Sequence, residues 1–200
     1  MIHELLKKRY SPRVFADKNI EHEKIVGLLE AARWSPSSMN GQPWRFIIAS
    51  KEDISNFNNL LSVVNEHNKT WAKNAAVLIL TVAKVDFDST GQLNKHAWYD
   101  LGNAVANLTF QATAMDLFVR QMGGFNVEKA RDVFSIPEGY QTVSVLAVGY
   151  KGNPEMLPEA LRIGEKTART RKDLDEIAFK EKFGKPYIEL EHDVSLRKAG

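Results

Sequence analysis

Two groups of basic side chains stand near opposite ends of the 200-residue sequence. The groups are Lys7, Lys8, Arg9 and Arg13, and Lys166, Arg169, Arg171 and Lys172. Arginine presents a planar fork of N–H donors that matches phosphate oxygens, and Ser11 adds a neutral hydroxyl to the first group. One interpretation is that both groups converge on a single phosphomonoester. The other is that each is a solvated run of charge, and spacing alone favours this second interpretation.

A polar loop, residues 36–43, lies between a predicted apolar helix and a predicted apolar strand. Its hydrogen-bonding side chains are Ser37, Ser38, Asn40 and Gln42. Such a cluster suits the donor and acceptor edge of a flat heterocycle, although these residue types are also common in plain connections. Further along, Gly123-Gly124 would let backbone N–H groups approach a planar ligand, or form a simple turn.

Other familiar kinds of catalytic site are missing from the sequence. There is no cysteine, and the five histidines form no HExxH or HxH pair, so no metal site is predicted. No GxSxG, GxGxxG or GxxxxGK[ST] motif is present. If the protein is an enzyme, the difficult step therefore falls to an organic cofactor rather than to a side chain.

The composition limits the classes of protein to which the chain can belong. Hydrophobic residues make up 44% and charged residues 26%, which is typical of a globular chain, and the length predicts a single domain over residues 1–200. A net charge of +2 is too small to indicate a nucleic-acid partner. No apolar run is long enough to span a bilayer, and the first residues lack a secretory signal. We therefore expect a soluble cytoplasmic protein with no membrane partner.

The hydrophobic pattern predicts an α+β fold of helices mixed with three or four strands, without regular βαβ alternation. Helices are expected over residues 2–9, 21–34, 96–117 and 127–134, and strands over residues 44–49, 75–85 and 141–150. The strand at 75–85 is apolar at nearly every position, which indicates burial on both faces. Residues 151–200 show little apolar periodicity, so we expect this tail to pack on another surface, such as a partner subunit.

Four segments, taken in order, resemble the FMN-dependent nitroreductase family. They are Arg9-Tyr10-Ser11-Pro12-Arg13-Val14-Phe15, Ser35-Pro36-Ser37-Ser38-Met39-Asn40-Gly41-Gln42-Pro43-Trp44, Met122-Gly123-Gly124-Phe125, and Arg169-Thr170-Arg171. The resemblance implies an interlocked α+β homodimer, with a mixed or antiparallel sheet flanked by helices in each subunit and FMN at the subunit interface. It also reverses the preference for solvated charge, because both basic groups fall within the matching segments.

The resemblance implies a role for each matching residue. Arg9 and Ser11 would hold the FMN phosphate together with Arg169 and Arg171, and Tyr10 belongs to the same segment. The remaining residues would surround the flavin ring.

On the ring, Arg13 would face the N1–O2 edge, where negative charge gathers on reduction. The Gly123 N–H would donate near N5, Gly124 would lie beside it, and Asn65 would meet the pyrimidine edge. From the other subunit, the loop would supply the following residues: Pro36, Ser37, Ser38, Asn40 and Gln42.

The implied reaction is a ping-pong transfer of a hydride from NADH or NADPH, through the flavin, to an electron-poor small molecule such as a nitroaromatic or a quinone. Two departures leave the substrate open: some members have Glu-Gly where this chain has Gly123-Gly124, and residues 86–95 leave little room for a covering helix. Alternatives are dehalogenation, oxidation or flavin fragmentation on the same fold, or FMN storage without turnover. A nucleic-acid module is disfavoured because the aromatic residues lie in apolar segments.

Overall fold

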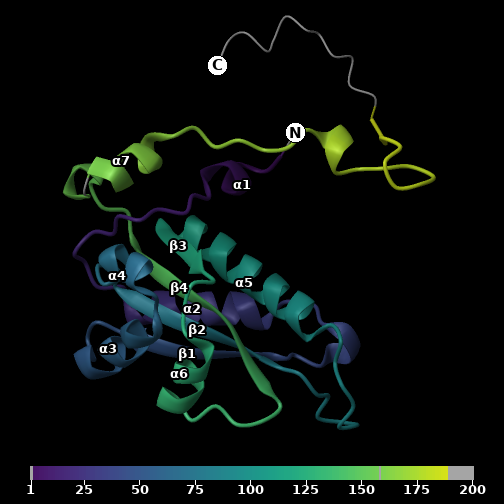
Figure 1. Ribbon diagram of the computed structural model, residues 1–200, viewed down its shortest axis with the longest axis horizontal. Helices are drawn as coiled ribbons and strands as arrows, with labels where there is room; N and C mark the ends of the chain where they lie inside the picture. Colours follow the sequence, from purple (N-terminus) through teal and green to yellow (C-terminus); the bar gives the residue numbers. More distant parts are fainter. Residues whose placement is uncertain (1, 158, 189–200) are drawn as a thin grey trace, which may run out of the picture. The chain divides into compact units, whose positions relative to one another are not determined.

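Four hydrophobic segments pair into one antiparallel sheet in the computed structural model of the chain (Figure 1). The structure describes residues 2–157 and 159–188 and separates into two units, residues 1–165 and 166–200. The strands are β1 (Trp44–Ser50), β2 (Val77–Lys84), β3 (Leu117–Met122) and β4 (Tyr140–Tyr150). Their order is β1-β2-β4-β3, so β1 and β3 form the two edges.

Helices precede, connect and follow these strands. They are α1 (Glu4–Lys8), α2 (His22–Arg33), α3 (Ile54–Val63), α4 (Glu66–Ala72), α5 (Ala97–Ala114), α6 (Val127–Val133) and α7 (Glu159–Lys166). Short 3-10 turns are η1 (Ser38–Asn40), η2 (Pro154–Met156) and η3 (Leu174–Glu176). None of the helices in the described ranges is long and apolar enough to cross a membrane.

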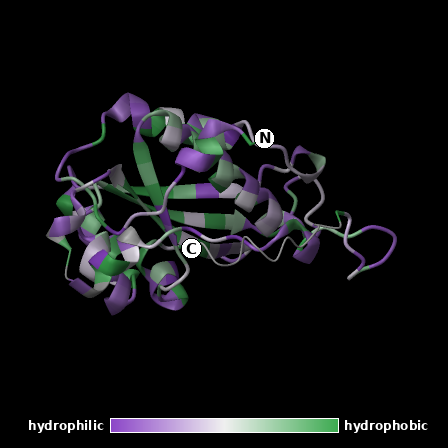
Figure 2. Ribbon diagram, turned by 90° about the horizontal axis from the view of Figure 1, so that it is seen from above, coloured by the Kyte–Doolittle hydropathy of each residue, from purple (hydrophilic) through white to green (hydrophobic). Residues whose placement is uncertain are grey.

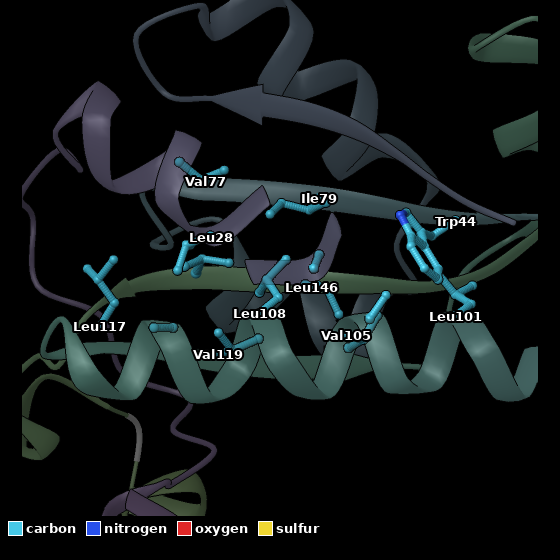
Figure 3. Packing of buried hydrophobic residues seen from close by; sticks show 14 of the residues in the cluster. Leu28, Trp44, Val77, Ile79, Leu101, Val105, Leu108, Leu117, Val119 and Leu146 are labelled. Carbon is cyan, nitrogen blue, oxygen red and sulfur yellow. The ribbon is translucent and has the colours of Figure 1, made fainter. Parts of the chain in front are cut away.

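Both faces of the sheet are covered, because successive side chains of a strand point to opposite faces. Val77 and Ile79 of β2 pack with the buried side of α2 and α5, where Leu28 and Leu108 lie (Figure 3). The other face packs with the following residues of α3 and α4: Phe57, Leu60 and Trp71. The strands are largely green in Figure 2, which marks them as hydrophobic. The predicted α+β class and the two-sided burial of residues 75–85 are confirmed.

The predicted helix at 96–117 was too long, and the strand that follows it was missed. Helix α5 ends at Ala114, and Asp116 adopts a left-handed backbone with φ of 59°. Aspartate tolerates this conformation, and the chain reverses there to form β3 beside β4, with Leu117 opposite Tyr150. A local helical pattern could not reveal this reversal, since β3 is held by pairing with residues far away in sequence.

Helices α3 and α4 were also missed, in a segment for which no element was predicted. Each begins at a capping side chain: Asp53 accepts from the Asn56 N–H, and Asn65 accepts from the Asn68 N–H at 2.9 Å. The apolar residues of α3 and α4 close the second face of the sheet.

Part of the predicted tail lies within the first unit. Lys151 forms a β-bridge with Phe15, and the Gly152 N–H donates to the Val14 carbonyl. Leu157 is buried, and Leu161 of α7 packs against the same hydrophobic cluster as Phe15. Packing of the later residues on a partner subunit stays a prediction.

Candidate functional site

The segment of residues 9–13 runs beside the edge strand β3. Helix α1 ends at Lys8, and the backbone of Arg9 is no longer helical. Arg120 of β3 donates from Nη1 to the Ser11 carbonyl at 2.6 Å, and its guanidinium lies 5.2 Å from the centre of the Trp71 ring. This contact joins the first predicted motif to the face of the sheet that α4 covers.

Arg120 was not predicted as a site residue. Its sequence signal is a single arginine inside an otherwise mostly apolar strand segment, Leu117–Met122. Burial, together with the nearby charge of Arg13, lowers the pKa of Arg120. Two guanidinium groups therefore share a partly buried region, which favours an anion as ligand.

A carboxylate from α7 binds the same segment. Glu165 accepts the Arg13 backbone N–H at 2.7 Å, and its other oxygen accepts the Tyr10 hydroxyl. Burial and this hydrogen bond raise the pKa of Tyr10 to about 12, so the hydroxyl stays protonated at neutral pH. The Arg13 Nε is buried and has no hydrogen-bond partner among the described residues. Glu165 thus holds the Arg13 backbone and leaves a buried cationic donor unsatisfied.

Two of the predicted cations have partners outside this cluster. Lys7 pairs with Glu4, and Lys8 pairs with Asp116 at 2.6 Å. Both lysines therefore form ion pairs on the protein surface. Arg169 and Arg171 lie in the second unit, where both are exposed, and their predicted role at a phosphate stays a prediction.

Gly124 and Asn65 lie together. The Asn65 N–H donates to the Gly124 carbonyl at 3.1 Å, and the Asn68 side-chain amide donates to the same oxygen at 3.4 Å. Trp71 lies on the same helix α4, so this pair is connected through it to Arg120 and the segment of residues 9–13. The tertiary structure thus brings Asn65, Gly124 and the segment of residues 9–13 onto one face of the sheet.

Gly124→Ala is expected to destabilise the protein by about 1 kcal/mol, the typical value of a helix N-cap. A Cβ at Gly124 would lie 2.2 Å from Asn65 Nδ2, which forces the capping side chain to move. Urea unfolding measures the change. Gly123→Ala is the matched control, because a Cβ there meets nothing within 4 Å. Equal stabilities of the two variants would contradict the prediction.

The polar loop forms a separate group with the start of α5. Three of its residues, Met39, Asn40 and Gln42, have left-handed backbones with φ between 43° and 53°. Ser37 Oγ accepts the Gln42 N–H, and the buried Asp100 accepts the Ser38 N–H at 3.0 Å. The loop and α5 enclose a pocket of about 380 Å³. The fold therefore holds this loop in a strained conformation next to a hollow.

Asp100→Ala is expected to cost about 1–3 kcal/mol, because it removes the buried carboxylate that accepts the partly buried Ser38 N–H. Thermal and urea unfolding measure the loss. Asp100→Asn keeps an acceptor oxygen and should stay closer to the parent protein. An Ala variant as stable as the Asn variant would show that Asp100 does not support the loop.

The two groups lie at opposite edges of the sheet. The loop leads into β1, and Gly123 follows β3; three strand spacings of about 4.8 Å separate these edges by about 14 Å. They also lie on different faces, because Arg120 contacts Trp71 on one face and the pocket belongs to α5 on the other. One chain therefore presents two separate groups of candidate site residues.

Comparisons with known proteins show the family and the fold of this chain. A model of the nitroreductase family matches residues 6–150. A solved oxidoreductase containing FMN is similar with a TM-score of 0.87 and 29% identity, over 92% of this chain and 94% of that one. The major NAD(P)H-flavin oxidoreductase of Aliivibrio fischeri is 25% identical, over 75% of this chain and 87% of that protein. Iodotyrosine deiodinase of Thermotoga neapolitana is 34% identical over 74 residues, 37% of this chain and 39% of that protein.

Proposed function

The chain belongs to the nitroreductase family, and from that premise we propose that it is an FMN-dependent oxidoreductase. It uses NADH or NADPH to reduce an electron-poor small molecule. The observation that carries this proposal is the buried Arg13 Nε, which lacks a partner among the described residues beside a second guanidinium, that of Arg120. An anionic ring edge or phosphate would satisfy it, so the residues present fit FMN.

Residues from both ends of the chain would hold the phosphate. Arg9 and Ser11 provide a guanidinium and a hydroxyl at the start of the first unit, and Arg169 and Arg171 provide two more guanidinium groups. Tyr10 lies between the first two and is fixed by its hydrogen bond to Glu165. A phosphate there would be held by charge-assisted hydrogen bonds from more than one direction.

The ring would lie against α4 and the end of β3. Arg13 would place positive charge at the N1–O2 edge, the Gly123 N–H would donate near N5 with Gly124 beside it, and Asn65 would meet the pyrimidine edge. Bound FMN supplies the ability to accept a hydride from the nicotinamide and to pass it on to a nitroaromatic, a quinone or a similar acceptor. The protein contributes position and a fixed positive charge, and no side chain is required as an obligate acid or base.

The other group of candidate site residues would come from a second copy. Pro36, Ser37, Ser38, Asn40 and Gln42 lie on the opposite face and edge of the sheet, so we place them against the flavin of a partner subunit. Exposed apolar side chains surround them: Trp34 is 74% exposed, Met39 75% and Tyr99 72%. Large apolar side chains gathered on a surface favour a protein interface, and the later part of residues 151–200 would also pack on the partner.

Trp34→Asp is expected to shift the protein from dimer to monomer, because it places a charge at the centre of this apolar surface. Sedimentation velocity over a range of protein concentrations measures the shift. Ile54→Asp is the control, since Ile54 is 60% exposed on α3, on the other face of the sheet. A parent protein that sediments as a monomer at every concentration would contradict the dimer.

Anaerobic mixing tests the reaction. The purified protein should release a yellow compound identified as FMN on denaturation, and NADH or NADPH should bleach the bound flavin within seconds. Adding a nitroaromatic or quinone should restore the colour. Flavin that stays yellow with both nicotinamides would instead indicate a storage protein. The partial similarity to a deiodinase makes reductive dehalogenation the second candidate, for which a halogenated phenol would restore the colour and release halide.

A further inference from the structure

Helix α7 is attached to the segment of residues 9–13 by one side chain. Both carboxylate oxygens of Glu165 accept hydrogen bonds, one from the Tyr10 hydroxyl and one from the Arg13 backbone N–H at 2.7 Å. The Tyr10 hydroxyl also lies 3.1 Å from the Glu165 carbonyl. These contacts join positions more than 150 residues apart in the sequence, so they hold together two segments that local structure could not bring together.

The helix that carries Glu165 is itself held in place. Leu157 is buried, Leu161 packs against the hydrophobic cluster, and Arg162 pairs with Glu155 at 2.6 Å. A Cβ at Gly164 would lie 3.3 Å from Arg13 Nη1, so the missing side chain leaves room for the guanidinium. Glu165 therefore reaches Tyr10 and Arg13 from a packed element.

The hydrogen-bonding pattern indicates that Glu165 supports the segment of residues 9–13 and does not compete with an anionic ligand for the Arg13 guanidinium. A carboxylate that mimicked a ligand would pair with the Arg13 guanidinium, yet Glu165 accepts the Arg13 backbone N–H instead. The Arg13 Nε stays buried without a partner among the described residues, and Arg120 donates to the Ser11 carbonyl. Both guanidinium groups thus keep donor capacity for another anion while Glu165 is engaged.

We propose that Glu165 is a positioning residue that clasps residues 9–13 to the end of α7 and so holds Arg9 and Ser11 in place for the phosphate. The inference rests on the proposed binding of FMN and adds a residue that touches neither the ring nor the phosphate. Tight binding of the phosphate then requires the hydrogen bonds that Tyr10 and the Arg13 N–H donate to Glu165.

Titration of apo-protein with FMN and with riboflavin, which lacks the phosphate, tests the clasp. Glu165→Ala should weaken FMN binding about 10-fold and riboflavin binding by less, because the clasp holds the phosphate residues Arg9 and Ser11 as well as Arg13, which faces the ring. Glu165→Gln keeps one acceptor oxygen and should restore part of the FMN affinity. Glu159→Gln, an exposed carboxylate on the same helix, is the control and should change neither constant.

Hydrogen exchange of the apo-protein gives a readout that needs no flavin. Amides of residues 9–15 should exchange faster in Glu165→Ala than in the parent, and Tyr10→Phe should add little to Glu165→Ala because the two share one interaction.

Three outcomes would overturn the clasp: unchanged FMN affinity, tighter FMN binding, or equal weakening of FMN and riboflavin. Tighter binding would mean that Glu165 competes with the phosphate. A parent protein that binds neither flavin would overturn the proposed function, whereas the exchange of residues 9–15 would still report on the clasp.

Discussion

Replacing Arg9 by alanine is expected to weaken FMN binding about 10- to 150-fold. The substitution removes a charge-assisted hydrogen bond to the phosphate, which is worth roughly 1.5–3 kcal/mol, and each 1.4 kcal/mol is a tenfold change in Kd. Arg171→Ala should have an effect of the same size. Quenching of flavin fluorescence on titration of apo-protein measures both.

Lys7→Ala provides the matched control for Arg9. Lys7 belongs to the same basic group but pairs with Glu4 on the surface of α1, and it lies before the motif Arg9–Phe15. FMN affinity should change less than about 2-fold in this variant, since an exposed cation contributes little. Equal losses in Lys7→Ala and Arg9→Ala would indicate general attraction of charge. Unchanged titrations in Arg9→Ala and Arg171→Ala would contradict the phosphate assignment.

Trp71→Ala is expected to destabilise the protein by about 3–5 kcal/mol, because it leaves a cavity in a close-packed core. Trp71 is 0% exposed, packs with α3 and the sheet, and lies beneath the Arg120 guanidinium. Arg120 in turn donates to the Ser11 carbonyl. The substitution should therefore also weaken FMN binding, since it loosens the support of the phosphate-binding segment.

Urea unfolding in the absence of flavin measures the stability loss, and Trp71→Phe should recover much of it by filling the cavity in part. Phe183→Ala is the control, because Phe183 is 92% exposed and its truncation should change stability by about 0.5 kcal/mol or less. A Trp71→Ala protein that loses less than about 1 kcal/mol would show that this core position tolerates a cavity.

Local signals were sufficient for most of the regular elements. The apolar stripe of α2, the continuous apolar run of β2 and the strand β4 were predicted close to their observed ranges, because each pattern is complete within its own segment. Residue type singled out the basic group around Arg9 and the polar loop around Ser37. Their assignment to a flavin site came from the resemblance to the family, since spacing alone favoured solvated charge for the basic group.

Elements that depend on distant partners were not predictable in this way. Strand β3 was missed because its pairing with β4 joins residues far apart in sequence. Helices α3 and α4 were missed, although their capping residues Asp53 and Asn65 gave a local signal.

The amino-acid sequence by itself determined which chemical groups are available: a chain without cysteine, two sets of arginines, a polar loop and a pair of glycines. Only the tertiary structure decided which of them meet. It brought Arg120 within hydrogen-bonding distance of the Ser11 carbonyl and Glu165 within that distance of the Arg13 N–H. It also placed the polar loop on the opposite face of the sheet. The physical reason is that a hydrogen bond or a buried charge depends on distance and solvent exposure, and both are set by packing between segments that the sequence keeps far apart.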